Sequence, residues 1–134
     1  MVNPIPNLKK QHETQIRVRY QETDAQGHVH HANYINYFEI GRVEMLRDSG
    51  VSYREFEESG LMLVIVNVTC DYFLPAQYDD LLTLKTTLVK AKGVRIRHAY
   101  EIQRGEDVIA NGESVVACVS HDGKPTALPK WLTY

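Results

Sequence analysis

The sequence lacks the features that would assign it to several large classes of protein. No apolar run approaches the roughly 20 residues that a membrane-spanning helix requires. No segment is strongly basic and the net charge is only -2, so nucleic-acid binding is not indicated. Internal repeats, low-complexity tracts and linker-like stretches are also absent. We therefore expect a single domain over residues 1–134, with 1–13 as a flexible lead-in.

Only two cysteines are present, and their spacing matches neither a metal site nor a redox motif. Cys70 and Cys118 both lie in apolar, strand-like runs, which favours buried free thiols. Free thiols are typical of proteins in a reducing compartment. The first residues also lack the apolar stretch of a signal peptide. Together these features predict a cytoplasmic protein.

Hydrophobic periodicity predicts a strand followed by a long helix. Polar and apolar residues alternate over 15–20, as in a half-buried strand. From residue 32 or 33 to about 49, apolar residues recur at three- and four-residue steps, which is typical of an amphipathic helix. Asn33 is the expected N-cap of this helix, and Gly50 is its expected stop.

The second half of the chain is predicted to be rich in strands. A capping-box pair, Ser52 and Glu55, first indicates a short helix before Gly60. Strands are then expected over 61–73, 81–90, 94–103 and 108–120, with a possible bulge at Gly112. A long helix with an apolar stripe must bury that stripe against the sheet that such strands form. The predicted fold class is α+β, with a curved antiparallel sheet wrapped around one helix.

The segment 22–34 carries the chemistry, because it puts the Asp24 carboxylate in a loop directly before the long helix. A helix N-terminus presents unpaired backbone N–H groups and the positive end of the helix dipole, which can stabilise an oxyanion. A nearby carboxylate can attack a carbonyl or deprotonate a water. The arrangement predicts an acyl-transfer site. The alternative is that Asp24 is a turn residue or a cap, since acidic residues are common before helices.

A longer motif gives a more specific prediction than an acyl-transfer site. Residues 24–34, with Tyr37, Phe38, Glu39 and Arg42, resemble the signature of the 4-hydroxybenzoyl-CoA thioesterase family of hot-dog proteins. The resemblance is strongest to the branch associated with the bacterial Tol–Pal gene cluster, and it covers about 15–121. It implies a hot-dog fold with about five strands and hydrolysis of an acyl-CoA thioester without a cofactor. It also implies a homodimer or homotetramer with active sites at the subunit interface.

The resemblance assigns roles to residues of the loop. The family's catalytic aspartate falls on Asp24, which would act as nucleophile or general base. The family's oxyanion donor, a backbone N–H at the helix start, falls on His31. The His31 side chain could assist the reaction, or it could only cap and pack. Gly27 is expected to permit the tight path of the loop past the thioester.

Contacts with the rest of the substrate are expected from the helix and three strands. The candidate acyl-pocket residues are Tyr34, Leu63 and Val64, and the candidate CoA-phosphate contacts are Lys92 and Arg95, which cluster with Lys90 and Arg97. Core packing and a solvated polar face are the respective alternatives. Glu39 and Arg42, three residues apart on the helix, are expected to form an ion pair. The alternative for Glu39 is a second carboxylate at the site.

Three other functions remain open. A metal-dependent hydrolase could use His28, His30 and His31, although no His-x-x-x-His pair is present and Glu39 is too distant for a cupin-like site. A non-catalytic module that binds acyl-CoA or an acyl carrier protein would keep the pocket without needing Asp24. A hot-dog dehydratase or hydratase would carry a different His-centred motif, which is not recognisable here. We expect no bound metal.

Overall fold

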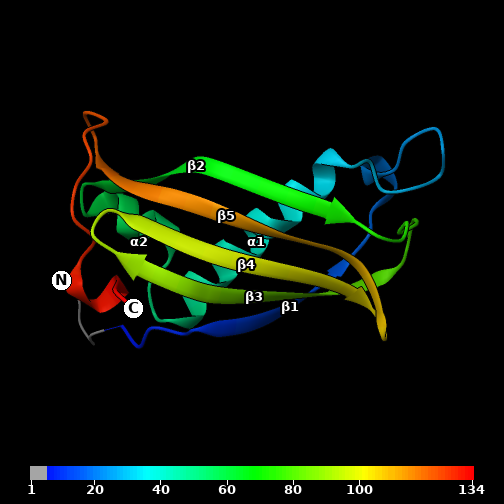
Figure 1. Cartoon of the computed structure of the whole chain (residues 1–134), viewed down its shortest axis with the longest axis horizontal. Coiled ribbons are helices and arrows are strands. Elements are labelled where there is room, and N and C mark those ends of the chain that lie inside the picture. Colours follow the sequence, from blue (N-terminus) through cyan, green and yellow to red (C-terminus); the bar gives the residue numbers. More distant parts are fainter. Residues whose placement is uncertain (1–5) are drawn as a thin grey trace.

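The computed structural model describes residues 6–134, in which one antiparallel sheet curves around the long helix α1 (Ala32–Asp48) (Figure 1). The strands are β1 (Gln11–Arg17), β2 (Leu61–Tyr72), β3 (Leu81–Lys92), β4 (Arg95–Arg104) and β5 (Asp107–Ser120). The short helices are η1 (Tyr20–Glu22), α2 (Tyr53–Glu58) and η2 (Lys130–Leu132). The predicted α+β class, with strands wrapped around one helix, is confirmed.

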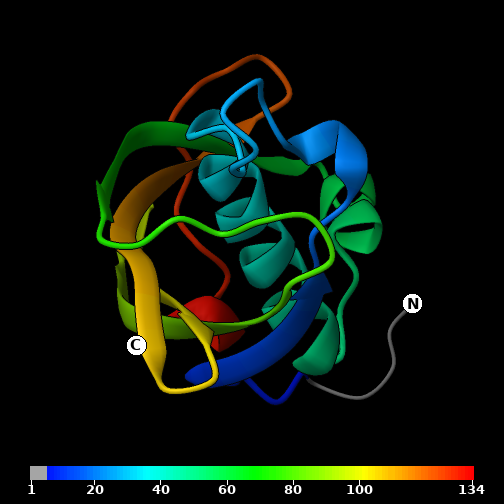
Figure 2. The ribbon, with the colours of Figure 1, turned by 90° about the vertical axis from the view of Figure 1, so that its right-hand side faces the viewer.

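The strand order in the sheet is β1-β3-β4-β5-β2, so β2 lies at the edge next to β5 rather than beside β3. The chain must therefore return from one edge of the sheet to reach β3. Figure 2 shows this connection, residues 73–80, crossing the N-terminal end of α1. The Val29 N–H donates to the Ala76 carbonyl oxygen at 2.8 Å and joins the connection to the loop before the helix. The sheet order thus brings the end of β2 to the start of α1.

The N-terminal strand differs from the prediction at both ends. It begins at Gln11 and ends at Arg17, because the chain turns into η1 before residue 20. The expectation of a flexible lead-in over 1–13 is wrong for 11–13, which pair with β3. The Asn7 N–H also donates to the Ser49 carbonyl oxygen at 2.9 Å. Residues 1–5 of the expected lead-in lie outside the described part of the chain.

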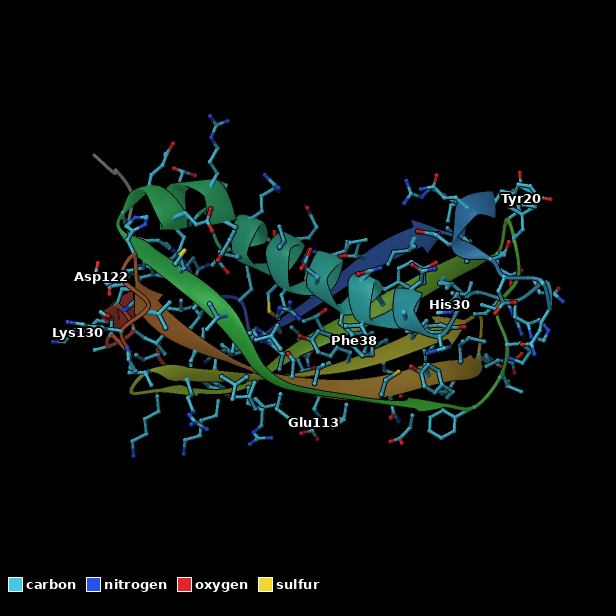
Figure 3. The ribbon with its side chains drawn as sticks, turned by 90° about the horizontal axis from the view of Figure 1, so that it is seen from above. Tyr20, His30, Phe38, Glu113, Asp122 and Lys130 are labelled. Carbon is cyan, nitrogen blue, oxygen red and sulfur yellow. The ribbon has the colours of Figure 1, made fainter. Side chains whose placement is uncertain are left out.

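The core lies between α1 and the concave face of the sheet. Phe38 is fully buried and stacks on Tyr100 of β4, with the ring centroids 4.3 Å apart. Figure 3 shows Phe38 pointing from α1 toward the sheet, whereas Glu113 points away from the opposite face. A Cβ atom at Gly41 would overlap Thr86 Oγ1 on β3. The helix and the sheet therefore approach closely, and the helix position is set by packing.

The ends of the helices agree with the prediction except at the start of α1. Gly50 ends α1 with a φ of 101°, and the Ser52–Glu55 capping box at α2 is confirmed. Asn33 is not the N-cap, because helical geometry already begins at His31. The Asn33 side chain instead donates to the Glu22 carbonyl oxygen at 2.9 Å. No helix within residues 6–134 is long and apolar enough to cross a membrane.

The predicted bulge at Gly112 is wrong, because its pairing with both neighbouring strands is continuous. The register shifts lie elsewhere, between Ile65 and Asn67, between Leu88 and Lys90, and between Ile102 and Gln103. A Cβ atom at Gly112 would overlap the Thr69 carbonyl oxygen and meet the Phe38 ring. The glycine is therefore required by close packing and not by an irregular strand.

Candidate active site

The loop that carries Asp24 is closed by its own backbone hydrogen bonds. The Asp24 N–H donates to the His28 carbonyl oxygen, and the Gly27 N–H donates to the Asp24 carbonyl oxygen, both at 2.9 Å. The Gln26 N–H donates to Asp24 Oδ1 at 2.9 Å. Gly27 has a φ of 80°, in the region that favours glycine. The loop thus holds one oxygen of the Asp24 carboxylate, and the second accepts no hydrogen bond from residues 6–134.

The start of α1 lies on the other side of the same loop. The Asn33 N–H donates to the His30 carbonyl oxygen at 2.8 Å, and the Ala32 N–H donates to His30 Nδ1 at 3.2 Å. The His31 N–H donates to no acceptor in the described chain. An unpaired donor at a helix N-terminus is suited to bind a carbonyl oxygen or an oxyanion.

A surface cavity of about 280 Å³ joins these two features. Its lining residues are Asp24, Gln26, His28, Val29, His31, Tyr34, Tyr72, Phe73, Leu74 and Pro75. Of the residues singled out from the sequence, Asp24, His28, His31 and Tyr34 line this cavity, and Gly27 lies in the loop at its edge. The residues at 72–75 were not predicted. Their signal in the sequence is a run of large apolar residues, exposed in the structure, directly before Pro75.

Tyr72 connects the end of β2 to the helix start. Its O–H donates to the His31 carbonyl oxygen at 3.1 Å, and its ring packs edge-on against Tyr34, with the centroids 5.5 Å apart. Desolvation of the partly buried phenol is the main cause that raises the pKa of Tyr72 to about 12, and burial also raises the pKa of Tyr34. Both phenols therefore stay protonated at neutral pH. They form a neutral, aromatic wall beside the Asp24 carboxylate.

The other four predicted substrate contacts, Leu63, Val64, Lys92 and Arg95, do not line the cavity beside Asp24 of the same chain. Leu63 lines a second cavity of about 250 Å³, between β2 and the C-terminal half of α1. Val64 lies on the exposed β2 edge, with an exposed fraction of 41%. Lys92 and Arg95 face each other at the β3–β4 turn. In Figure 1 this turn lies at the opposite end of the sheet from the Asp24 loop.

The predicted ion pair between Glu39 and Arg42 does not form. Arg42 Nη1 instead donates to the Tyr100 hydroxyl oxygen at 3.1 Å, and no carboxylate of residues 6–134 lies within 4.0 Å of its guanidinium. Glu39 is exposed on α1. Both residues line the second cavity. Arg42 thus contacts the sheet and not Glu39, and the buried Tyr100 hydroxyl also forms a hydrogen bond with Ser114 Oγ.

The three adjacent histidines do not converge on a common point. The His30 and His31 rings stack, with their centroids 4.2 Å apart, and His30 Nδ1 already accepts the Ala32 N–H. Between residues 6 and 134, no group of three or more histidine, cysteine, aspartate or glutamate side chains is arranged to hold a metal ion. The geometry of these side chains therefore does not favour the metal-dependent alternative.

Beside the second cavity, His98 on β4 is a buried histidine with a testable effect on stability. Burial, and then the charge of Arg42, lowers the pKa of His98 from 6.5 to about 3. The unfolded chain takes up this proton below about pH 6.5, whereas the folded chain does not until about pH 3. Stability should therefore fall as the pH is lowered through this window, by about 2 kcal/mol at pH ~5 from this residue.

Urea unfolding at about pH 7 and about pH 5 measures this effect. We expect His98→Gln to unfold with a smaller difference between the two pH values than the wild type. His121→Gln, at an exposed turn, is the matched control and should keep the wild-type difference. An equal pH dependence in wild type and His98→Gln would show that His98 does not remain neutral in the folded state.

Comparison with known proteins decides the family, because the model of the thioesterase-like superfamily matches residues 18–134. The chain belongs to this superfamily. It is 35% identical over 117 residues to the acyl-CoA thioester hydrolase YbgC of Escherichia coli O6:H1, covering 86% of this chain and 87% of that protein.

Solved structures of thioesterases share the fold. A probable thioesterase from Bartonella henselae superposes with a TM-score of 0.85 at 35% identity, over 89% of this chain and 99% of that chain. The DHNA-CoA thioesterase from Staphylococcus aureus gives a TM-score of 0.84 at 28% identity, over 88% of this chain and 80% of that chain. The predicted hot-dog fold and thioesterase family are confirmed, and the chain is a thioesterase-family enzyme.

Proposed function

We propose that the protein hydrolyses an acyl-CoA thioester to a free acid and CoA, with Asp24 as nucleophile or general base. The observation that carries the proposal is the cavity that holds both the Asp24 carboxylate and the His31 end of α1. The similarity to an acyl-CoA thioester hydrolase over 86% of the chain supports the substrate class. A carboxylate and an unpaired N–H at one cavity are the two groups that attack on a carbonyl requires.

The reaction follows from the roles of these two groups. The thioester carbonyl oxygen accepts a hydrogen bond from the His31 N–H, which stabilises the oxyanion of the tetrahedral intermediate. If Asp24 is the base, it takes a proton from water, the water oxygen bonds to the carbonyl carbon, and the C–S bond then breaks. The proton returns to the CoA sulfur. If Asp24 is the nucleophile, its oxygen bonds to the carbonyl carbon, the C–S bond breaks, and CoA leaves as the thiolate. Water then hydrolyses the mixed anhydride to the free acid and the Asp24 carboxylate, and the proton released goes to the CoA sulfur.

We also propose that two copies pair along β2. β2 is an edge strand, and Val64, Ile65 and Val66 are 41 to 48% exposed on it. The Tyr53 hydroxyl accepts the Leu63 N–H at 3.0 Å, so the backbone is already occupied at this end of the strand. The remaining length of an apolar edge strand is an available template for antiparallel pairing. This supports a continuous sheet across a homodimer, from which a homotetramer could form.

Such a dimer would complete the substrate site. Leu63 and Val64 lie near the start of β2, whereas Tyr72 and the Asp24 loop lie at its end. In Figure 1, the β3–β4 turn, which joins the Lys92 end of β3 to the Arg95 end of β4, lies at the same end of the sheet as the start of β2. A twofold axis near the middle of β2 would bring this end of one copy to the Asp24 end of the other. The predicted acyl-pocket and CoA contacts would then come from the second copy.

Val66→Lys tests the pairing by adding a charge to the β2 edge of both copies. Two like charges that meet across a symmetric interface cost several kcal/mol. We expect the dimer dissociation constant to rise at least ~10-fold and the rate per chain to fall with dimer content. Sedimentation velocity measures the mass. Val89→Lys, on β3 and exposed to 45%, is the matched control, and unchanged mass in Val66→Lys would exclude this interface.

The test of the proposed function is release of free thiol from a panel of aromatic, short-chain and long-chain acyl-CoA thioesters. We expect release from at least one class, and the relative rates identify the acyl group. If no substrate is hydrolysed while acyl-CoA still binds by calorimetry, the protein is a binding module and the proposal is wrong. A cytoplasmic location is also part of the proposal, and it is supported by the two free thiols, Cys70 and Cys118.

A further inference from the structure

Glu22 is a buried carboxylate, with an exposed fraction of 9%, two residues before Asp24. Both of its oxygens are occupied. Oε1 accepts the Arg19 N–H at 2.8 Å and the Tyr37 O–H at 2.9 Å. Oε2 accepts Arg19 Nη2 at 3.2 Å and Arg19 Nε at 3.3 Å. A buried carboxylate is tolerated when its hydrogen bonds are satisfied in this way, and it then holds its partners firmly.

The backbone of Glu22 joins the two sides of the active-site loop. Its carbonyl oxygen accepts the His30 N–H at 2.9 Å and the Asn33 side-chain amide at 2.9 Å. One residue thus contacts the segment that leads into Asp24, the end of the loop, and the first turn of α1. Figure 3 shows η1, marked by Tyr20, at the same end of the molecule as His30.

The Tyr37 hydroxyl extends this connection into the core. Tyr37 is 1% exposed and lies on the same helix whose N-terminus faces the cavity. Burial, and then the hydrogen bond to Glu22, raises the pKa of Tyr37, so the phenol remains a donor at any working pH. The carboxylate therefore links η1 to a fixed point on α1 through Oε1. Glu22 itself does not line the substrate cavity.

We propose that Glu22 is a positioning residue that, through Tyr37 and Arg19, sets the place of the Asp24 carboxylate relative to the α1 N-terminus. This inference rests on the proposed function, in which attack by Asp24 or its water and stabilisation by the His31 N–H must occur on one carbonyl group. The Glu22 carboxylate itself touches no reacting atom. Displacement of a reacting group by about 1 Å can lower a rate about 100-fold, so a loosened loop has a large expected effect.

Glu22→Gln and Tyr37→Phe test the connection with little change of shape. Glutamine has one side-chain oxygen, so it cannot accept both from the Arg19 N–H with Tyr37 and from the Arg19 guanidinium. Phenylalanine leaves Oε1 without the phenol. We expect either variant to lower kcat about 10- to 100-fold with KM changed less than ~3-fold, at a temperature where circular dichroism shows a folded protein. The double variant should lose no more than the larger single loss. Glu13→Gln, an exposed carboxylate on β1 at the opposite edge of the sheet from β2, is the matched control.

Combination with Asp24→Asn separates positioning from a general loss of structure. If Glu22 acts through Asp24, Glu22→Gln should leave the residual rate of Asp24→Asn unchanged. A general structural defect would lower that residual rate by the same factor as in the wild type, and this would overturn the inference. Wild-type kcat in folded Glu22→Gln would overturn it as well. If Asp24→Asn hydrolyses at the wild-type rate, the proposed role of Asp24 fails instead, whatever Glu22→Gln does.

Discussion

Asp24→Asn is expected to lower kcat for acyl-CoA hydrolysis by about 10²- to 10⁴-fold, while acyl-CoA binding remains close to that of the wild type. Asparagine has the same shape as aspartate, and its side-chain oxygen can still accept the Gln26 N–H that aspartate accepts at 2.9 Å. The loop should therefore keep its form. The amide can neither attack the thioester effectively nor take a proton from water at neutral pH.

Thiol release measures kcat and calorimetry measures acyl-CoA binding, in parallel for Asp24→Asn and the wild type. Asp122→Asn is the matched control, because this carboxylate is exposed in the turn after β5, at the other end of the molecule from His30 (Figure 3). We expect the control to hydrolyse at the wild-type rate. Equal rates for Asp24→Asn and the wild type would remove Asp24 from the reaction and leave the cavity with a binding role only.

Gly112→Ala is expected to lower the free energy of unfolding by about 3 kcal/mol or more, although it adds one methyl group. The new Cβ atom would overlap the Thr69 carbonyl oxygen on β2 and meet the Phe38 ring from α1. Backbone on one side and a fully buried ring on the other leave no flexible group to give way. β5 would have to move away from β2 or from the helix.

Urea unfolding midpoints for the purified variants measure this loss. Glu113→Ala is the matched control on the adjacent residue of β5, whose side chain is exposed and pairs with Arg97 at 3.2 Å. Loss of such a surface ion pair should cost about 1 kcal/mol or less. A Gly112→Ala midpoint as close to wild type as that of Glu113→Ala would mean that α1 can shift to relieve the contact.

Local sequence patterns predicted most of the elements because short-range interactions determine them. The three- and four-residue steps of apolar residues predicted α1, and the Ser52–Glu55 pair predicted α2. Errors arose where a distant group competed with a local one. Asn33 would make a good cap by itself, but helical geometry already begins at His31, and the Asn33 amide donates to the Glu22 carbonyl oxygen. Glu39 and Arg42 have the spacing of a helical ion pair, but the Arg42 guanidinium donates to the Tyr100 hydroxyl oxygen instead.

In the candidate site too, the residues close together in the sequence were predicted and the distant one was not. Asp24, His31 and Tyr34 were predicted together because they are close in sequence, and one loop and one helix turn carry them to one cavity. Tyr72 could not be placed from its own neighbours, since its hydrogen bond to the His31 carbonyl oxygen spans 41 residues. This hydrogen bond forms because β2 lies at the edge of the sheet and the end of β2 meets the start of α1.

By itself, the sequence determined the α+β class, the long helix, the strands and the Asp24 loop, because periodicity, capping and turn formation involve residues a few positions apart. It also determined the thioesterase family, through a motif that is contiguous in the chain. Only the tertiary structure decided the strand order, the partner of Arg42, the aromatic wall at Tyr72 and the satisfied carboxylate of Glu22. These features depend on which distant groups meet when α1 packs into the curved sheet, and that packing is a property of the whole chain.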